Sequence, residues 1–521
     1  MTQTAPRRPT LFVAVIAATV ALGGCATTLP SLDNRVETSA LADTGGTRLG
    51  RALSADVAAH PGKSGIHPLP GPRDAFAARG VLAGAADKSI DVQYYIWHGD
   101  HVGYLLFEAL WEAAGRGVRV RMLLDDANTP GLDPTIAALD AHPNIEVRLY
   151  NPFVQRGSRA LGYLSDFTRL NRRMHNKSFT VDNQIAVVGG RNIGNEYFGA
   201  GGGVVFADLD VAAVGPVVRQ VSMEFDTYWS SPSAYPAASF IGNSGAEGTA
   251  ALKQRFAETR AHPASIAYLD AVRHTSLARD ILARRVEFEW VETRAVFDDP
   301  AKTLDTTART DVLLFPQLVK LIGKPRKSLD LISPYFVPRD DGTAALVALA
   351  GSGVQVRILT NSLAASDVSA VHAGYAKHRA ALLKAGVQLY ELKPTAGRDA
   401  PVDRAGLGSS SSAGLHAKTF AVDGKRVFVG SFNFDPRSAR LNTEMGMVID
   451  SPKLARNLAE AFETSAPKVA YQVRLAADGL SLEWIERTAS GDKVYSTEPD
   501  TTFFKRFGVQ VISLFPIDWL L

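Results

Sequence analysis

The chain carries one sequence pattern twice. Residues 174–192 read MHNKSFTVDNQIAVVGGRN and residues 415–433 read LHAKTFAVDGKRVFVGSFN, 241 positions further on. Three earlier apolar runs recur at similar offsets: KSIDVQYYIW at 88–97 with KSLDLISPYF at 327–336, GVRVRMLLDD at 117–126 with GVQVRILTNS at 353–362, and NIEVRLYNP at 144–152 with GVQLYELKP at 386–394. Each run has strand character, with helical stretches between the runs. The sequence therefore predicts a duplicated α/β fold in which each half is a sheet covered by helices.

The 521 residues leave room for more than the two repeated halves. We expect the following segments: a signal peptide at 1–24, a linker at 25–75, the first half at 76–245, a mostly helical intervening segment at 246–315, the second half at 316–465 and a C-terminal extension at 466–521. The tail FFKRFGVQVISLFPIDWLL at 503–521 is apolar with two cations. It suits either a membrane contact or a packed core strand, and the strand is the favoured interpretation.

The N-terminus has the pattern of an exported protein. Arg7 and Arg8 precede an apolar run at 11–22, which is too short to span a bilayer but suits a signal peptide. The sequence LGGC at 22–25 resembles a bacterial lipobox, in which the cysteine is lipidated; a plain secretory signal with a chance cysteine is the alternative. We therefore expect a lipoprotein of the bacterial cell envelope, periplasm-facing and held at the membrane by acyl chains on Cys25.

Each copy of the pattern places a His and a Lys side by side. The two-residue period of a strand puts His175 and Lys177 on one face, and it does the same for His416 and Lys418. A metal site is disfavoured, because Lys would repel the cation and no third ligand has the usual spacing. Lysine beside a neutral imidazole suits an anionic substrate, since the ammonium stabilises negative oxygens and the imidazole serves as nucleophile or acid.

The remaining motif residues support an anion site formed by both copies. Asn192 and Asn433 follow glycine turns and can donate to the same oxygens, whereas Asp182 and Asp423 fall in turns, which favours a mainly structural role. Two copies that face each other about a pseudo-twofold axis would place two imidazoles on opposite sides of one phosphorus. That geometry allows in-line displacement through a covalent phosphohistidine.

The two H-x-K-x4-D-x6-G-[GS]-x-N stretches resemble the paired motif of the phospholipase D superfamily. The resemblance implies two mixed-sheet halves with the active site at their interface, and metal-independent transfer at a phosphodiester without a cofactor. It implies His175 as nucleophile and His416 as acid. The other motif residues, by the same resemblance, belong to the catalytic and phosphate-binding set: Lys177, Asp182, Asn192, Lys418, Asp423, Ser431 and Asn433. Gly190 departs from the family, which usually has Ser there, so a hydroxyl role in the first half is in doubt.

Each imidazole needs a partner on its other nitrogen to fix its tautomer. Glu444 follows His416 by 28 residues, where the family carries an orienting carboxylate, and we expect it to orient His416. In the first half Asp208 and Asp210 are the candidates, and Asp208 is preferred because it aligns with the family's acidic position. Ordinary edge-strand acids are the alternative for both Glu444 and Asp208. Arg172 and Arg173 either meet a lipid headgroup or are simply solvated.

Three substrate classes remain open: a phosphatidyl transferase, a phospholipase that uses water, and a nuclease. A net charge of +3 does not indicate the extended basic surface that a nuclease needs, so nucleic acid is not expected as a partner. The lipobox-like segment places the site beside phospholipids. The stretches QYYIW, SPYFVP and GGRNIGNEYF make the chain similar to bacterial cardiolipin synthases, which favours transfer to a lipid.

Overall fold

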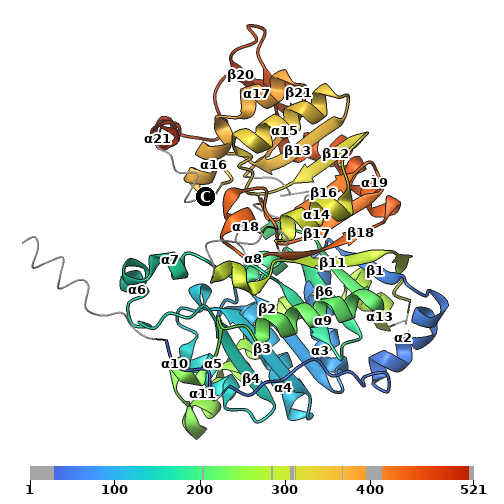
Figure 1. The fold of residues 1–521 in the computed structure, drawn as a ribbon, viewed down its shortest axis with the longest axis vertical. Helices are drawn as coiled ribbons and strands as arrows, with labels where there is room; N and C mark the ends of the chain where they lie inside the picture. Colours follow the sequence, from blue (N-terminus) through green and yellow to red (C-terminus); the bar gives the residue numbers. More distant parts are fainter. Residues whose placement is uncertain are drawn as a thin grey trace, which may run out of the picture.

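The structure, a computed structural model, describes residues 29–33, 35–201, 205–282, 285–304, 310, 313–366, 368–394 and 413–514. Its two large mixed sheets lie one above the other in Figure 1, the first half below and the second half above. The predicted signal peptide at 1–24 and Cys25 lie outside the described residues. Within the described residues, no helix combines the length and the apolar character needed to cross a bilayer.

The first sheet has nine strands in the order β10-β1-β8-β6-β5-β2-β3-β4-β9. Its centre consists of β2 (Ser89–Tyr94), β3 (Arg119–Asp125), β4 (Ile145–Tyr150), β5 (Ser178–Val181), β6 (Ile185–Gly189) and β8 (Asp210–Val214). The strands β2, β3 and β4 are parallel, and the others pair antiparallel with their neighbours. Strand β1 (Ser64–Leu69) lies between β8 and β10, and the edge strands are β9 (Ala234–Pro236) and β10 (Glu289–Val291).

The second sheet repeats this order. Its strands run β11-β18-β17-β16-β12-β13-β14-β19-β20-β21, so that β18-β17-β16-β12-β13-β14 corresponds to β8-β6-β5-β2-β3-β4. Their bounds are β11 (Thr293–Phe297), β12 (Ser328–Ile332), β13 (Gln355–Asn361), β14 (Gln388–Leu392), β16 (Lys418–Val422), β17 (Arg426–Gly430), β18 (Met445–Ile449), β19 (Ala470–Leu475), β20 (Leu482–Thr488) and β21 (Gly491–Tyr495). The predicted duplicated α/β fold is confirmed.

Helices cover the outer face of each sheet. On the first sheet these are α3 (Pro72–Ala85), α4 (His101–Gly115), α5 (Asp133–Asp140), α11 (Gly245–Ala261), α12 (Pro263–Arg273) and α13 (Ser276–Leu282). On the second sheet they are α14 (Leu314–Ile322), α15 (Arg339–Gly351), α16 (Ser369–Ala376) and α17 (Arg379–Lys384). The chain also contains α2 (Arg48–Ala59), α10 (Ala238–Ile241) and α20 (Ala466–Val469).

Alternating strand residues build a core between the sheets. Val188 of β6 and Val429 of β17 pack in this shared cluster, whereas Val187 and Phe428 point to the helices of their own halves. The helices α9 (Pro216–Trp229) and α19 (Pro452–Glu460) contribute to the same cluster. Because the halves share one buried apolar core, the interface between them is a fixed part of the fold.

Three segments predicted to lie outside the two halves contribute strands to the two large sheets. Strand β1 lies in the predicted linker at 25–75 but pairs with β8. The segment 246–315 is mostly helical as far as α13, and after α13 its two strands, β10 and β11, join different sheets. The predicted extension at 466–521 supplies β19 to β21 of the second sheet. Edge strands from outside the repeat therefore complete both sheets.

The favoured interpretation of the tail as a core strand is wrong. Residues 503–513 form the helix α21 (Phe503–Ser513), and residues 515–521 lie outside the described residues. Its register buries Val509 and leaves Phe504 81% exposed.

Candidate active site

The two motif aspartates close turns. Asp182 and Asp423 have positive φ angles of 52° and 55°, a conformation that Asn and Asp tolerate best among residues with a side chain. The Asp182 carboxylate accepts hydrogen bonds from the backbone N–H groups of residues 87–89, and that of Asp423 from residues 326–328. Neither lines the pocket, and these contacts agree with the mainly structural role expected from the turns; their place in the catalytic set stays a prediction.

Each catalytic-motif His follows a short parallel bridge to the opposite half. Met174 pairs with Thr443, and the His175 N–H donates to the Thr443 carbonyl at 2.8 Å. In the other copy β15 (Ala413–Leu415) pairs with β7 (Val205–Ala207), and the His416 N–H donates to the Ala207 carbonyl at 2.9 Å. Each imidazole therefore lies beside the residue that follows the bridge in the other half.

The orienting acids are exchanged between the halves. Nδ1 of His175 is 2.9 Å from Oε2 of Glu444, and Nδ1 of His416 is 2.6 Å from Oδ2 of Asp208. The expectation that Glu444 orients His416 is wrong, because the bridges carry each His across the interface to the other half's acid. Both acids are fully buried.

Gly190 stands where the second half has Ser431, and the acid beside it, Asp208, is one methylene shorter than Glu444. Ser431 donates its hydroxyl to Oε2 of Glu444 at 2.5 Å and accepts the Met445 N–H at 3.0 Å. A Cβ at Gly190 would instead overlap the carboxylate of Asp208. The shorter acid thus occupies the space where the second half has a serine side chain. Ser431 does not line the pocket, and its hydroxyl contacts Glu444; its phosphate contact stays a prediction.

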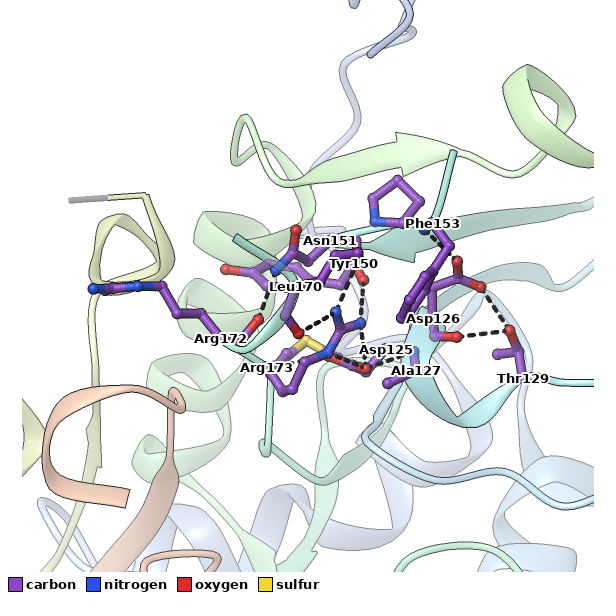
Figure 2. Close-up of polar contacts among 12 residues, drawn as sticks. Asp125, Asp126, Ala127, Thr129, Tyr150, Asn151, Phe153, Leu170, Arg172 and Arg173 are labelled. Carbon is purple, nitrogen blue, oxygen red and sulfur yellow. Dashed lines mark hydrogen bonds and ion pairs between the residues drawn. The ribbon is translucent and has the colours of Figure 1, made fainter. Parts of the chain in front are cut away.

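Arg173 fixes the segment that carries His175. Figure 2 shows its guanidinium pointing to Asp125, with Arg173 Nη2 and Asp125 Oδ1 2.6 Å apart, while the side chain of Arg172 points away. Asp125 also accepts the Met174 N–H at 2.8 Å. Arg173 is 1% exposed, so it neither meets a headgroup nor is solvated as expected from sequence. Arg172 donates to the Lys302 carbonyl at 2.7 Å.

Both imidazoles border one pocket at the interface of the halves. Its volume is about 200 Å³, and its lining includes the predicted residues His175, Asn192, His416, Lys418 and Asn433. Lys177 is buried beside it and donates to the His175 carbonyl at 2.5 Å. Lys418 makes the same contact with the His416 carbonyl. Asn192 accepts the Ile96 N–H at 3.1 Å and donates to the Tyr197 hydroxyl at 3.1 Å.

Sequence reasoning missed the aromatic wall of the pocket. Tyr95 packs edge-on against His175 with ring centroids 4.8 Å apart, and Tyr197 packs likewise against His416 at 5.1 Å. The lining residues not predicted from the sequence also include Phe206, Tyr335, Asn361, Arg437 and Asn442. The stretch QYYIW gave a signal for Tyr95, but no pattern indicates which aromatic side chains meet across the halves.

The electrostatics of the pocket favour neutral imidazoles and a bound anion. Burial, together with the ammonium of Lys177, lowers the pKa of His175, and burial with Lys418 lowers the pKa of His416 to about 4. Burial also lowers the pKa of Lys177. A negative phosphoryl group in the pocket would oppose each of these shifts, because it stabilises the protonated forms.

The pKa values of the two orienting acids, Asp208 and Glu444, shift in opposite directions. Burial opposes ionisation of Asp208, but the neighbouring His416 and Lys418 outweigh it and lower its pKa. Burial raises the pKa of Glu444 to about 7, against the opposing effect of Lys177. Asp208 is therefore ionised at neutral pH, whereas Glu444 keeps its proton to a higher pH than an ordinary glutamic acid does.

A separate cluster has the composition of a metal site. His98, Asp100 and Glu196 hold ligand atoms within 4.8 Å of one another. Asp100, however, caps α4 through the Gly103 N–H and also accepts the Asn195 N–H. His98 lies 3.1 Å from Glu196 as an ion pair. None of the three lines the pocket, and their mutual contacts account for their positions.

Known proteins match this arrangement. The family model described as "Cardiolipin synthase, PLD-like domain" matches residues 82–229 and again residues 318–465. The chain belongs to this family. The two matched ranges of the PLD-like domain correspond to the central strands of the two sheets, and each contains one His-Lys pair.

Similar proteins extend the match over most of the chain. "Cardiolipin synthase C" of Escherichia coli (strain K12) is 48% identical over 475 residues, which cover 91% of this chain and 100% of that protein. An "Uncharacterized protein" of Helicobacter pylori (strain J99) is 31% identical over 88% of this chain and 90% of its own length. The crystal structure of a phosphatidylserine synthase from Haemophilus influenzae has the same fold, with a TM-score of 0.53 at 14% identity over 89% of this chain and 96% of that one.

Proposed function

We propose that the protein is a phosphatidyltransferase that makes cardiolipin from phosphatidylglycerol. The observation that carries the proposal is the pair of imidazoles at one pocket, each held on Nδ1 by a buried carboxylate and flanked by a lysine. Nδ1 is occupied by the carboxylate, so the free nitrogen of each ring is Nε2. The 48% identity to a cardiolipin synthase over 91% of the chain supports a lipid substrate.

In the first half-reaction, Nε2 of His175 attacks the phosphorus of phosphatidylglycerol. The bond to the glycerol oxygen breaks as His416 donates its proton to that oxygen, which leaves free glycerol and a phosphatidyl group on His175. This order is supported by Asp208, because an ionised carboxylate stabilises the imidazolium that His416 must form before it acts.

In the second half-reaction, His416 acts as base. It takes the proton from the glycerol hydroxyl of a second phosphatidylglycerol, whose oxygen attacks the phosphorus and releases His175. Oδ1 of Asn433 and Oδ1 of Asn442 are buried without a hydrogen-bond partner among the described residues, and both residues line the pocket. We propose that these amides bind the acceptor headgroup, while the lysines and Asn192 bind the phosphoryl oxygens.

Hydrolysis by water to phosphatidic acid is the alternative. The aromatic side chains of Tyr95, Tyr197 and Phe206 around the imidazoles favour transfer, because they restrict the access of water to the phosphohistidine. The test supplies the purified protein with phosphatidylglycerol, alone and with phosphatidylethanolamine. We expect cardiolipin and glycerol with little phosphatidic acid. Phosphatidic acid as the main product identifies a phospholipase, and cleavage of DNA without action on either lipid identifies a nuclease.

We also propose that Cys25 is the site of a lipid anchor that holds the protein in the bacterial cell envelope, periplasm-facing. The support is the sequence LGGC at 22–25 after an apolar run. Metabolic labelling with a fatty acid tests the anchor: the unchanged protein should take up label, and the Cys25→Ser variant should not. Equal label in the variant contradicts the proposal.

A further inference from the structure

The helix α21 presents an exposed apolar face. Phe503 is 66%, Phe504 81%, Phe507 53% and Leu514 82% exposed. The rings of Phe503 and Phe507 stack on each other, so the three phenylalanines form one patch. The helix contains Lys505 and Arg506 and no acidic residue. An exposed aromatic patch with interleaved cations is typical of a segment that lies in a membrane interface.

The opposite face of α21 packs against residues next to the active-site pocket. Val509 is 6% exposed and packs against Leu363 and Ala373. Leu363 lies in the chain between Asn361 and Ala365, both of which line the pocket. The exposed phenylalanines are therefore held in a fixed position relative to the pocket.

A second exposed apolar group lies in the first half and is connected to the pocket lining through one hydrogen bond. In the helices α6 (Arg159–Ser165) and α7 (Phe167–Leu170), Leu161 is 56%, Leu164 82% and Phe167 43% exposed. The residue after α7, Asn171, accepts a hydrogen bond from Arg437, which lines the pocket, at 2.8 Å. Figure 1 shows α6, α7 and α21 projecting from the same side of the molecule, the first two from the lower half and α21 from the upper half.

We propose that α21 and the α6–α7 segment form one membrane-docking surface that turns the pocket toward a bilayer containing anionic phospholipid. The proposal rests on the proposed function, because an enzyme that joins two membrane lipids must reach both headgroups at the bilayer surface. The cations of α21 favour anionic over zwitterionic lipid. Acyl chains on Cys25 would hold the protein at the membrane without setting how the pocket faces it, so a second contact would fix the orientation of the pocket.

The test follows the position of a fluorescent probe. Cys25 is the only cysteine, so the full chain with Cys25→Ser and Phe504→Cys carries one thiol for an environment-sensitive dye. The matched control is Cys25→Ser with Leu480→Cys, because Leu480 is 74% exposed in a turn outside these helices. Vesicles of phosphatidylglycerol and phosphatidylcholine should shift the emission to the blue at position 504 but not at position 480. Equal emission at the two positions overturns the proposal. A blue shift at position 504 that needs no vesicles and grows with protein concentration assigns the face to a second copy of the chain and also overturns it.

A separate activity measurement distinguishes this proposal from the proposed function. The variant with Phe503→Ser, Phe504→Ser and Phe507→Ser should lose at least about tenfold in activity on vesicles, because it buries less apolar surface in the bilayer. On short-chain phosphatidylglycerol dispersed as monomers its activity should equal that of the unchanged protein. Equal activity of the two proteins on vesicles contradicts the docking surface, whereas the absence of cardiolipin from both proteins on both substrates contradicts the proposed function alone.

Discussion

His175 and Glu444 lie 269 residues apart in the chain and in different halves of the fold, yet Nδ1 of the imidazole is 2.9 Å from Oε2 of the carboxylate. Asp208 and His416 repeat the relationship in the opposite direction. Neither half contains a complete imidazole–carboxylate pair. The active site therefore depends on the interface between the sheets, and the shared apolar core holds that interface in place.

The crossed pairing predicts which imidazole responds to each acid. Asp208→Asn should change the tautomer balance of His416 and leave that of His175 unchanged, because the carboxylate holds the proton on Nδ1 of His416 only. Glu444→Gln should do the reverse. Nitrogen-15 NMR of histidine-labelled protein at neutral pH measures both rings at once. A response of the imidazole in the same half as the changed acid would contradict the pairing.

Gly190 should tolerate no side chain. Gly190→Ala places a methyl group against the carboxylate of Asp208, so we expect a lower melting temperature and a loss of activity on the order of tenfold or more. The control is Gly80→Ala, at a helical position of α3 where an added Cβ meets nothing within 4 Å. That change should stabilise the protein slightly, by about 0.5–1 kcal/mol. Similar melting temperatures for the two variants would show that the backbone at Gly190 does not lie against the Asp208 carboxylate.

The ion pair of Arg173 with Asp125 should contribute to stability and to the position of His175. Arg173→Ala leaves a buried carboxylate without its partner, which typically costs about 3–5 kcal/mol. The control, Arg426→Ala, breaks a half-exposed pair with Asp450 and should cost about 1 kcal/mol or less. Denaturant unfolding measures both free energies. Equal losses would show that burial does not distinguish the two pairs.

Glu224 should make stability depend on pH. It accepts the Asn176 amide at 2.7 Å, and burial raises its pKa to about 8 from an ordinary value of 4.5. Between these values the folded protein holds a proton that the unfolded chain releases, so the free energy of unfolding falls as the pH rises.

Glu224→Gln removes this effect. The variant should therefore gain stability relative to the unchanged protein between pH 5 and about pH 8. Unfolding curves across this range, with Glu460→Gln at the exposed end of α19 as control, measure the difference. If the free energy of unfolding depends on pH in the same way in the unchanged protein and in Glu224→Gln, the pKa of Glu224 is not raised in the folded state.

The sequence predicted the duplicated sheets because strand runs recur in the same order. It also predicted the turn positions of Asp182 and Asp423, since those signals are local. The exchange of acids could not be predicted, because the spacing from Glu444 to His416 is equally compatible with a contact inside one half. The strands β10 and β11 were missed because they lie outside the repeat.

The tail shows why a composition can mislead. Its aromatic and β-branched residues favour a strand, but Val509 and Ile512 are three residues apart and pack on one side of a helix. Arg173 was missed for a different reason: a charged residue gives no local signal that a distant carboxylate, Asp125, accompanies it into the core.

The central claim is that His175 carries the phosphatidyl group, and a trapped intermediate tests it most directly. A short-chain phosphatidyl-4-nitrophenol has a leaving group that needs no acid, so the His416→Ala variant should still form the phosphohistidine and then lack the base that resolves it. Peptide mass spectrometry should find one phosphatidyl group on His175 in this variant, and none at position 175 in His175→Ala. An adduct on His416 in His175→Ala, with none on His175 in the His416→Ala variant, would contradict the account.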